Sequence, residues 1–112
     1  MIHYMRLNDK TFQLIKDHKK TIELRLNDEK RQKIKINDFI IFENITTKDV
    51  IKVEVINIYK YESFEELYKY FSKTSLGYLE SEEKDFNDMY YYYSKSDIEK
   101  YGVMGIEIFF KE

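Results

Sequence analysis

The chain has 112 residues, of which 43% are apolar and 36% charged, and its formal net charge is −2. Such a mixture is typical of globular proteins rather than disordered segments, and the length suits one hydrophobic core, so we expect a single domain over residues 1–112. No run approaches the roughly 18 apolar residues of a membrane helix, the first residues lack a secretion-signal layout, and the absence of cysteine excludes disulfides and thiolate sites. We therefore expect a cytoplasmic protein that does not bind membranes.

The charges are distributed unevenly along the chain. Residues 1–35 contain ten Lys or Arg against five Asp or Glu, a balance of +5, whereas residues 36–112 contain nine against sixteen, a balance of −7. A basic first third permits one surface to bind an anionic ligand. The chain nevertheless lacks the uniformly basic character of many tight nucleic-acid binders.

Apolar periodicity and capping residues predict the elements of the first half. A short strand leads to a helix that Asn8 or Asp9 can cap, with Phe12 and Ile15 toward the core, and two more strands follow, separated by a charged surface segment. The expected elements are a strand over residues 3–7, a helix from this cap to about residue 16, a strand over 21–26, a surface segment over 27–35 and a strand over 39–42.

In the second half a long alternating segment predicts a bent strand over residues 50–61. Ser63 and Glu66 form a capping box that opens a helix, with an apolar stripe of Phe64, Leu67, Tyr68 and Phe71. A second helix is expected over residues 81–93. A third begins at a capping box formed by Ser96 and Glu99 and stops at Gly102, before a closing strand over residues 103–110.

The order of these elements indicates the fold class. Consecutive strands with few helices between them favour a mixed or antiparallel sheet over a doubly wound parallel one. We expect an α+β fold, a small curled sheet or incomplete β-barrel of about five strands, with helices packed over its ends. The charged strand over residues 21–26 would then line the gap between barrel and helices.

That strand carries the most informative motif, Lys20-Thr21-Ile22-Glu23-Leu24-Arg25. Because strand side chains alternate between two faces, Glu23 and Arg25 share one face while Ile22, Leu24 and Leu26 take the other. A charged group beside a buried row marks either a solvated surface salt bridge, worth about 0–1 kcal/mol, or the floor of a polar site. The pattern alone leaves both interpretations open.

Four motifs in order resemble the ASCH domain family of the PUA-like superfamily of small β-barrels. The first is the Lys20–Arg25 run after a short helix, and the second is the segment from Ile36 through Asp38 to Phe42, in which Asn37 replaces the usual glycine. The other two are Ser63 to Leu67, and Tyr92-Tyr93-Ser94 leading to Tyr101-Gly102 before the last strand. The resemblance covers almost the whole chain.

The resemblance implies a cleft lined by the Lys-x-x-Glu-x-Arg residues and binding of RNA or a nucleobase-like ligand. Some bacterial members are similar to amidohydrolases that act on acetylated cytidine, with a threonine nucleophile three residues after the lysine. In this chain that position is Glu23, which argues against a threonine mechanism. Thr21 is adjacent and on the same face, but it is not the matching position.

The resulting candidate ligand-binding residues are Lys20, Thr21, Glu23, Arg25, Tyr93 and Ser94. Arg25 offers a planar fork of donors for a phosphate or a base edge. Glu23 could accept from an exocyclic amine and hold Arg25, and Lys20 would supply a mobile positive charge. If the protein is an enzyme, Lys20 and Glu23 are the candidate catalytic residues.

Other aromatic and histidine residues have mainly structural interpretations. Tyr90 and Tyr93 share helical spacing with Phe86 and Met89, which predicts core positions, so Tyr91 and Tyr92 point elsewhere, where an exposed ring can stack on a base. His18 lies beside the basic run and is a weaker candidate for the cleft. Neither histidine has metal-ligand spacing, and we expect no metal and no cofactor.

We therefore predict a binding domain that takes a single-stranded RNA segment or a modified nucleoside into the cleft. One alternative is an amidohydrolase acting on an acylated nucleoside such as N4-acetylcytidine, with Glu23 as the base. The two neighbouring cations would lower the pKa of such a base, which counts against this mechanism. The other alternative is a protein-interaction module, which a cleft filled by its own side chains would favour.

Overall fold

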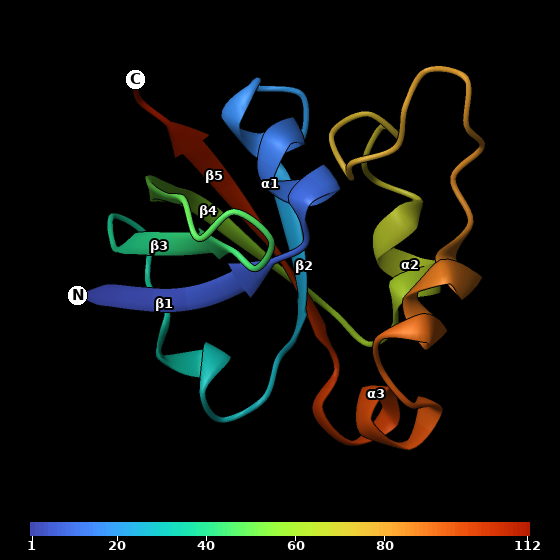
Figure 1. Cartoon of the computed structure of the whole chain (residues 1–112). Helices are drawn as coiled ribbons and strands as arrows, with labels where there is room; N and C mark the ends of the chain where they lie inside the picture. Colours follow the sequence, from blue (N-terminus) through green and yellow to red (C-terminus); the bar gives the residue numbers. More distant parts are fainter.

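The computed structural model describes residues 1–112 and contains one five-stranded sheet with short helices on either side of it (Figure 1). No helix is long and apolar enough to cross a membrane. The elements are β1 (Ile2–Leu7), α1 (Asp9–Lys16), β2 (Ile22–Leu26), η1 (Arg31–Lys33), β3 (Phe39–Asn44), β4 (Val50–Tyr61), α2 (Phe64–Tyr68), η2 (Phe86–Tyr91), α3 (Lys95–Tyr101) and β5 (Val103–Phe110).

The sheet is mixed and curled, with the strand order β1-β3-β4-β5-β2. Strands β1 and β3 are parallel, and the other neighbours are antiparallel. The long β4 pairs with both β3 and β5, and its register with β5 shifts between Val55 and Asn57. Such a bulge bends a strand and increases its twist. The predicted α+β class, the curled sheet and the bent strand over residues 50–61 are confirmed.

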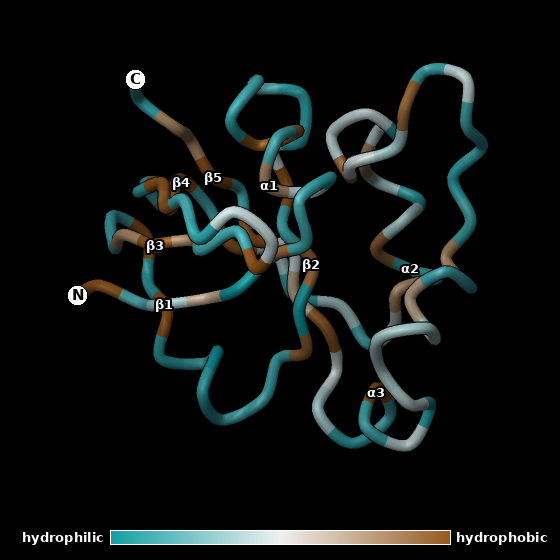
Figure 2. The backbone as a smooth tube through the Cα atoms, in the orientation of Figure 1, coloured by the Kyte–Doolittle hydropathy of each residue, from teal (hydrophilic) through white to brown (hydrophobic).

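The apolar faces of the elements form two clusters. Hydrophobic residues concentrate in the strands and hydrophilic ones in the connections (Figure 2). The first cluster fills the inside of the sheet under α1 and includes Phe12, Ile40, Phe42 and Met104. The second lies between β2 and the α2–α3 side, where Leu24, Leu67 and Met89 pack. Strand β2 therefore stands at the boundary between the two halves of the molecule.

The helix predicted over residues 81–93 is wrong. Residues 79–85 have no regular structure, and only the 3-10 helix η2 follows, capped by the Asp85 side chain, which accepts from the Asn87 amide. The preceding segment is held by other contacts, because Lys84 donates to the carbonyls of Tyr68 and Phe71 at 2.6 and 2.8 Å. With this change in periodicity Met89 is buried, but Tyr90 is 40% exposed, so its predicted core position is also wrong.

The helix ends show which predicted caps form. Ser63 accepts from the Glu66 amide at 3.1 Å, as predicted, but the Glu66 carboxylate contacts Lys69 and Tyr70 instead of returning to Ser63. Helix α3 is capped by Ser94 rather than by Ser96, because Ser94 accepts from the Asp97 amide at 3.2 Å.

Two backbone positions use left-handed geometry near these elements. Asn37 has φ 76°, which explains why asparagine is tolerated there. Gly102 ends α3 with φ 72°, and a Cβ at this position would lie 3.0 Å from the Tyr61 carbonyl oxygen.

Candidate ligand-binding cleft

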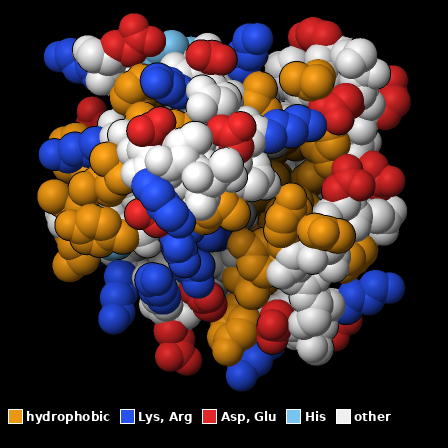
Figure 3. Space-filling model, viewed as in Figure 1, with side chains coloured by type: hydrophobic (Ala, Val, Ile, Leu, Met, Phe, Trp, Pro, Cys, Tyr) orange, Lys and Arg blue, Asp and Glu red, His pale blue; other side chains and the backbone are white.

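A cleft of about 490 Å³ opens between the α1 side of the molecule and the segment from α2 to η2. In the space-filling view the surface is hollowed there, with hydrophobic side chains along the hollow (Figure 3). Its size lies within the range of about 300–1,000 Å³ that is common for small-ligand sites. Three groups of residues line it: Lys20, Glu23, Leu24 and Arg25 on the floor; Arg6, Leu7, Asn8, Lys10, Thr11 and Leu14 on the α1 wall; and Tyr68, Leu76, Gly77, Tyr78, Glu82, Asp88, Met89, Tyr91, Tyr92 and Tyr93 on the η2 wall.

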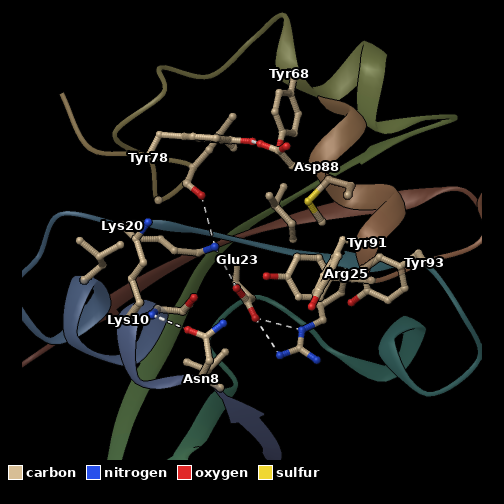
Figure 4. Close-up of a pocket in the computed structure, with 18 of the residues that line it drawn as sticks. Asn8, Lys10, Lys20, Glu23, Arg25, Tyr68, Tyr78, Asp88, Tyr91 and Tyr93 are labelled. Carbon is tan, nitrogen blue, oxygen red and sulfur yellow. Dashed lines mark hydrogen bonds and ion pairs between the residues drawn. The ribbon is translucent and has the colours of Figure 1, made fainter. Parts of the chain in front are cut away.

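The floor is a buried network of two cations around one carboxylate (Figure 4). Lys20 Nζ lies 3.3 Å from Glu23 Oε1, while Arg25 places Nε at 2.9 Å and Nη2 at 2.8 Å from Glu23 Oε2. Glu23 is 4% exposed and Lys20 is 8% exposed. Of the two interpretations that the pattern left open, the solvated surface salt bridge is therefore excluded.

Glu23 and Arg25 stay charged although they are buried, because each lies beside a group of opposite charge. Burial alone would raise the pKa of Glu23, but the charges of Lys20 and Arg25 outweigh burial and hold that pKa below its ordinary value. Burial alone would lower the pKa of Arg25, which Glu23 and the neighbouring Tyr93 raise instead. With two cations and one anion, the floor carries a net charge of +1.

Backbone pairing and a backbone contact fix Glu23 and Arg25 in place. Glu23 and Arg25 lie opposite Ile106 and Met104 in the β2–β5 pairing. Arg25 Nη2 also donates to the Arg6 carbonyl at 3.4 Å. Because β1 and β2 are the two edges of the sheet, Arg25 connects the edges that would have to pair to close the barrel.

Lys20 is held by the loop that follows α2, and it is therefore not the mobile charge expected from the sequence. Its Nζ donates to the Leu76 carbonyl at 3.3 Å. Gly77, with φ 102°, leaves room for the lysine, since a Cβ there would lie 2.9 Å from Lys20 Cδ. The Ser75 carbonyl accepts from the amides of Thr21 and Ile22, which anchors this loop at the start of β2.

The η2 wall contains a second polar network. The Tyr68 and Tyr78 hydroxyls lie 3.0 Å apart, and the Tyr78 hydroxyl is 2.7 Å from Asp88 Oδ2 and 3.0 Å from the Asp85 carbonyl. Burial raises the pKa of both tyrosines, so both hydroxyls keep their protons at neutral pH. Tyr68 itself is buried, and its ring packs edge-on against that of Tyr78.

The mouth of the cleft combines a charged contact with exposed rings. Lys10 in α1 reaches Glu82 on the opposite wall at 3.4 Å, and both side chains are solvated. Tyr91 is 88% exposed, and its ring lies edge-on to Tyr92, with centroids 5.3 Å apart. The ring of Tyr93 is stacked on Phe64 and reaches the cleft beside Arg25.

The structure brings together only some of the residues singled out from the sequence. Lys20, Glu23, Arg25 and Tyr93 line the cleft, whereas Thr21 and Ser94 do not. Thr21 precedes β2 and pairs through its backbone with Ser75 and Ile108.

The Ser94 hydroxyl caps α3 by accepting from the Asp97 amide. His18 also lies outside the cleft, because it contacts the rings of Phe109 and Phe110 and the Glu112 carboxylate at the end of β5. No group of three or more His, Asp or Glu side chains is arranged to hold a metal ion.

Several lining residues were not predicted from the sequence, notably Lys10, Tyr68, Tyr78 and Asp88. Tyr68 was assigned to the core stripe of its helix, and it is indeed buried, but its hydroxyl reaches the cleft network. Tyr78 lies on an irregular segment and Asp88 in the short 3-10 helix η2, so no α-helical or strand periodicity indicates which way their side chains point.

Comparison with known families identifies the class of protein that has this fold and cleft. The model of the ASCH domain matches residues 5–110, so the chain belongs to the ASCH domain family. The curled five-stranded sheet with its few helices is accordingly the PUA-like fold of that family.

Solved structures show the same architecture. The crystal structure of the hypothetical protein PH0355 is 35% identical, with a TM-score of 0.83, and the match covers 99% of this chain and 100% of that one. The solution structure of protein PF0455 from Pyrococcus furiosus is 37% identical, with a TM-score of 0.72, and the match covers 100% of this chain and 99% of that one.

A more distant likeness is to an S128A mutant of ZmASCH from Zymomonas mobilis. It is 13% identical with a TM-score of 0.57 and covers 99% of this chain and 68% of that one, and it shows the fold alone. No match is found among curated proteins.

Proposed function

We propose that the cleft binds a nucleobase, presented by single-stranded RNA or as a modified nucleoside, with its edge on the floor formed by Lys20, Glu23 and Arg25. The observation that carries the proposal is the burial of this network at the bottom of an open cleft. Burying three charges is costly even when they are paired, and replacing such a group with apolar residues is often neutral or stabilising. A recognition role explains why the charges lie here.

The geometry of the network leaves groups available to a ligand. The contacts to Glu23 and Arg6 use Nε and Nη2 of Arg25 and leave its Nη1 free of both. Glu23 Oε1 contacts Lys20 alone and keeps an open acceptor site. A donor group and an acceptor site on the same floor suit a base that carries both an amine and a ring nitrogen or carbonyl.

The remainder of the cleft suits an aromatic ligand with a backbone. Tyr91 and Tyr92 expose ring faces at the mouth, and stacking of a base on a tyrosine contributes about 1–3 kcal/mol. Arg6 and Lys10 on the α1 wall add positive charge that a phosphate can approach. Unstacked bases of single-stranded RNA are recognised by this combination of stacking and edge contacts.

The test is a titration of short single-stranded RNAs and ribonucleosides into the wild-type protein, Arg25→Ala and Lys20→Ala. Lys52→Ala, which removes a lysine on the outer face of β4, is the control for loss of charge, and thermal melting checks that each variant folds. We expect weaker binding by the Arg25 and Lys20 variants only. No binding by the wild type, or unchanged binding by both cleft variants, would contradict the proposal.

The amidohydrolase alternative is less well supported by the electrostatics. A general base for hydrolysis works best with a pKa near neutrality, whereas the pKa of Glu23 is lowered by Lys20 and Arg25. Glu23 also has Arg25 on one oxygen and Lys20 on the other, so it serves better as a fixed acceptor than as a proton carrier. The protein-interaction alternative predicted a cleft filled by its own side chains, but the cleft is open.

A further inference from the structure

The hydrogen-bonded chain on the η2 wall has a direction. The Tyr78 hydroxyl has one proton and four neighbours, and its shortest contact is 2.7 Å to Asp88 Oδ2. Donation to the carboxylate leaves the oxygen of Tyr78 to accept from the buried Tyr68 hydroxyl at 3.0 Å. Tyr68 therefore orients Tyr78, and Tyr78 orients the carboxylate of Asp88 on the cleft wall (Figure 4).

Asp88 differs from the other two carboxylates that line the cleft. Both oxygens of Glu23 contact cations, and Glu82 uses one oxygen for the Leu79 amide at 2.6 Å and the other for Lys10. Asp88 Oδ1, in contrast, makes no hydrogen bond to the protein. Among the three carboxylates that line the cleft, Asp88 Oδ1 is therefore the oxygen that no protein group contacts.

The charges of the two walls restrict which part of a nucleotide each wall can contact. The α1 wall presents Arg6 and Lys10, whose ion pairs with Glu43 and Glu82 are solvated, so both cations remain accessible to a phosphate. The η2 wall presents the Asp88 carboxylate, which repels a phosphate and requires a neutral hydrogen-bond donor. When a base occupies the floor between these walls, the neutral donors left on a nucleoside are the hydroxyls of its ribose.

We propose that Asp88, oriented by Tyr78 and Tyr68, accepts a hydrogen bond from the ribose 2′-hydroxyl and so selects ribonucleotides over deoxyribonucleotides. The inference rests on the proposed function, because it assumes a base on the floor. The 2′-hydroxyl is the group by which a protein distinguishes RNA from DNA. A deoxy ligand lacks this charge-assisted hydrogen bond, and the exposed Asp88 carboxylate is then solvated by water instead, so the deoxy ligand binds more weakly.

The experiment compares affinities of the full chain for matched ribo and 2′-deoxy ligands. The probes are cytidine, uridine, adenosine and guanosine, single-stranded RNA hexamers, and the 2′-deoxy counterpart of each. The variants are Asp88→Ala, which removes the acceptor, and Asp88→Asn, which keeps an oxygen for Tyr78 but loses the charge. Glu83→Gln removes an acidic charge nearby from a residue that does not line the cleft, and thermal melting checks folding.

We expect the wild type and Glu83→Gln to bind the ribo ligand about tenfold or more tightly than its deoxy counterpart. The ratio should fall to near one in Asp88→Ala and several-fold in Asp88→Asn, with deoxy affinity little changed. Equal ribo and deoxy binding by the wild type, or an unchanged ratio in both Asp88 variants, would overturn this inference and leave the proposed function standing. If neither ribo nor deoxy ligands bind, the proposed function fails and this inference fails with it.

Discussion

Arg25 holds a single oxygen of Glu23 with two of its nitrogens, Nε at 2.9 Å and Nη2 at 2.8 Å. The contact places the plane of the guanidinium against the carboxylate on the floor of the cleft and turns Nη1 away from it. A lysine at this position would supply the charge but not the fork. The relationship between these two residues sets both the electrostatics and the recognition geometry of the site.

Replacing Glu23 should cost far more stability than replacing a surface partner. In Glu23→Gln the buried Lys20 and Arg25 lose their counter-charge, and we expect unfolding free energy to fall by about 3 kcal/mol. The control is Glu43→Gln, which loses a solvated contact to Arg6 worth about 0–1 kcal/mol. Urea denaturation measures both. A loss of similar size in the two variants would contradict the structural role assigned to Glu23.

Asp38 should make stability depend on acid pH. Its hydrogen bond to His3, together with the Lys35 amide, lowers the pKa of Asp38 to about 2 from an ordinary value of 3.8. A carboxyl whose pKa is lower in the folded state stabilises it above the unfolded pKa, and this contribution disappears as pH falls through the folded pKa. The wild type should exceed Asp38→Asn by at most about 2 kcal/mol at pH 6.

That difference should decrease between pH 4 and pH 2. Chemical denaturation of both proteins across this range measures it, with the exposed Asp49→Asn as a control for general acid effects. A difference between wild type and Asp38→Asn that stays constant from pH 6 to pH 2 would refute the assignment.

Gly77 should be coupled energetically to Lys20. A Cβ at position 77 would lie 2.9 Å from Lys20 Cδ and 3.4 Å from its Nζ, and the backbone there has φ 102°. Gly77→Ala should therefore destabilise the protein by about 1–3 kcal/mol, through left-handed backbone strain and through the clash. In a Lys20→Ala background the clash disappears and only the backbone strain remains.

A double-mutant cycle measured by denaturation isolates the coupling between the two positions. We expect Gly77→Ala to cost at least about 0.5 kcal/mol less in the Lys20→Ala background than in the wild type. Equal costs in both backgrounds would show that Gly77 is needed for its backbone geometry alone.

The protein should not hydrolyse N4-acetylcytidine. Glu23 has a lowered pKa and contacts two cations, which makes it a poor proton acceptor for water at neutral pH. Chromatography of the nucleoside after incubation with the protein at pH 7 would detect cytidine. Deacetylation that is lost in Glu23→Gln would establish the hydrolase alternative instead.

Much of the fold was predictable because its patterns are local. The alternation over residues 50–61 and 103–110 marked β4 and β5 with their observed bounds, and the ordering of strands indicated a mixed sheet. The helix predicted over residues 81–93 failed because Phe86, Met89 and Tyr93 have spacings that a 3-10 helix and a turn also satisfy. Hydrogen bonds from the side chains of Lys84 to the Tyr68 carbonyl and of Tyr78 to the Asp85 carbonyl hold this segment outside an α-helix.

The floor of the cleft was predictable from the sequence, whereas the η2 wall was not. Lys20, Glu23 and Arg25 lie within six residues, so strand alternation placed the last two on a common face. Their burial was not predictable, because it depends on loop residues 75–77 packing over the start of β2. Asp88 is held on the cleft wall by a hydrogen bond from Tyr78, whose hydroxyl in turn contacts that of Tyr68, and no sequence pattern encodes such contacts.

The most direct test of the central claim is an NMR titration of the ¹⁵N-labelled chain with single-stranded RNA hexamers and ribonucleosides. If the cleft takes up a base, chemical-shift changes should concentrate at residues 20–25, 75–78 and 88–93, with the Arg25 side-chain resonances among them. The outer faces of β1, β3 and β4 should stay unchanged. Shifts confined to those outer faces, or no shifts at millimolar ligand, would contradict the account.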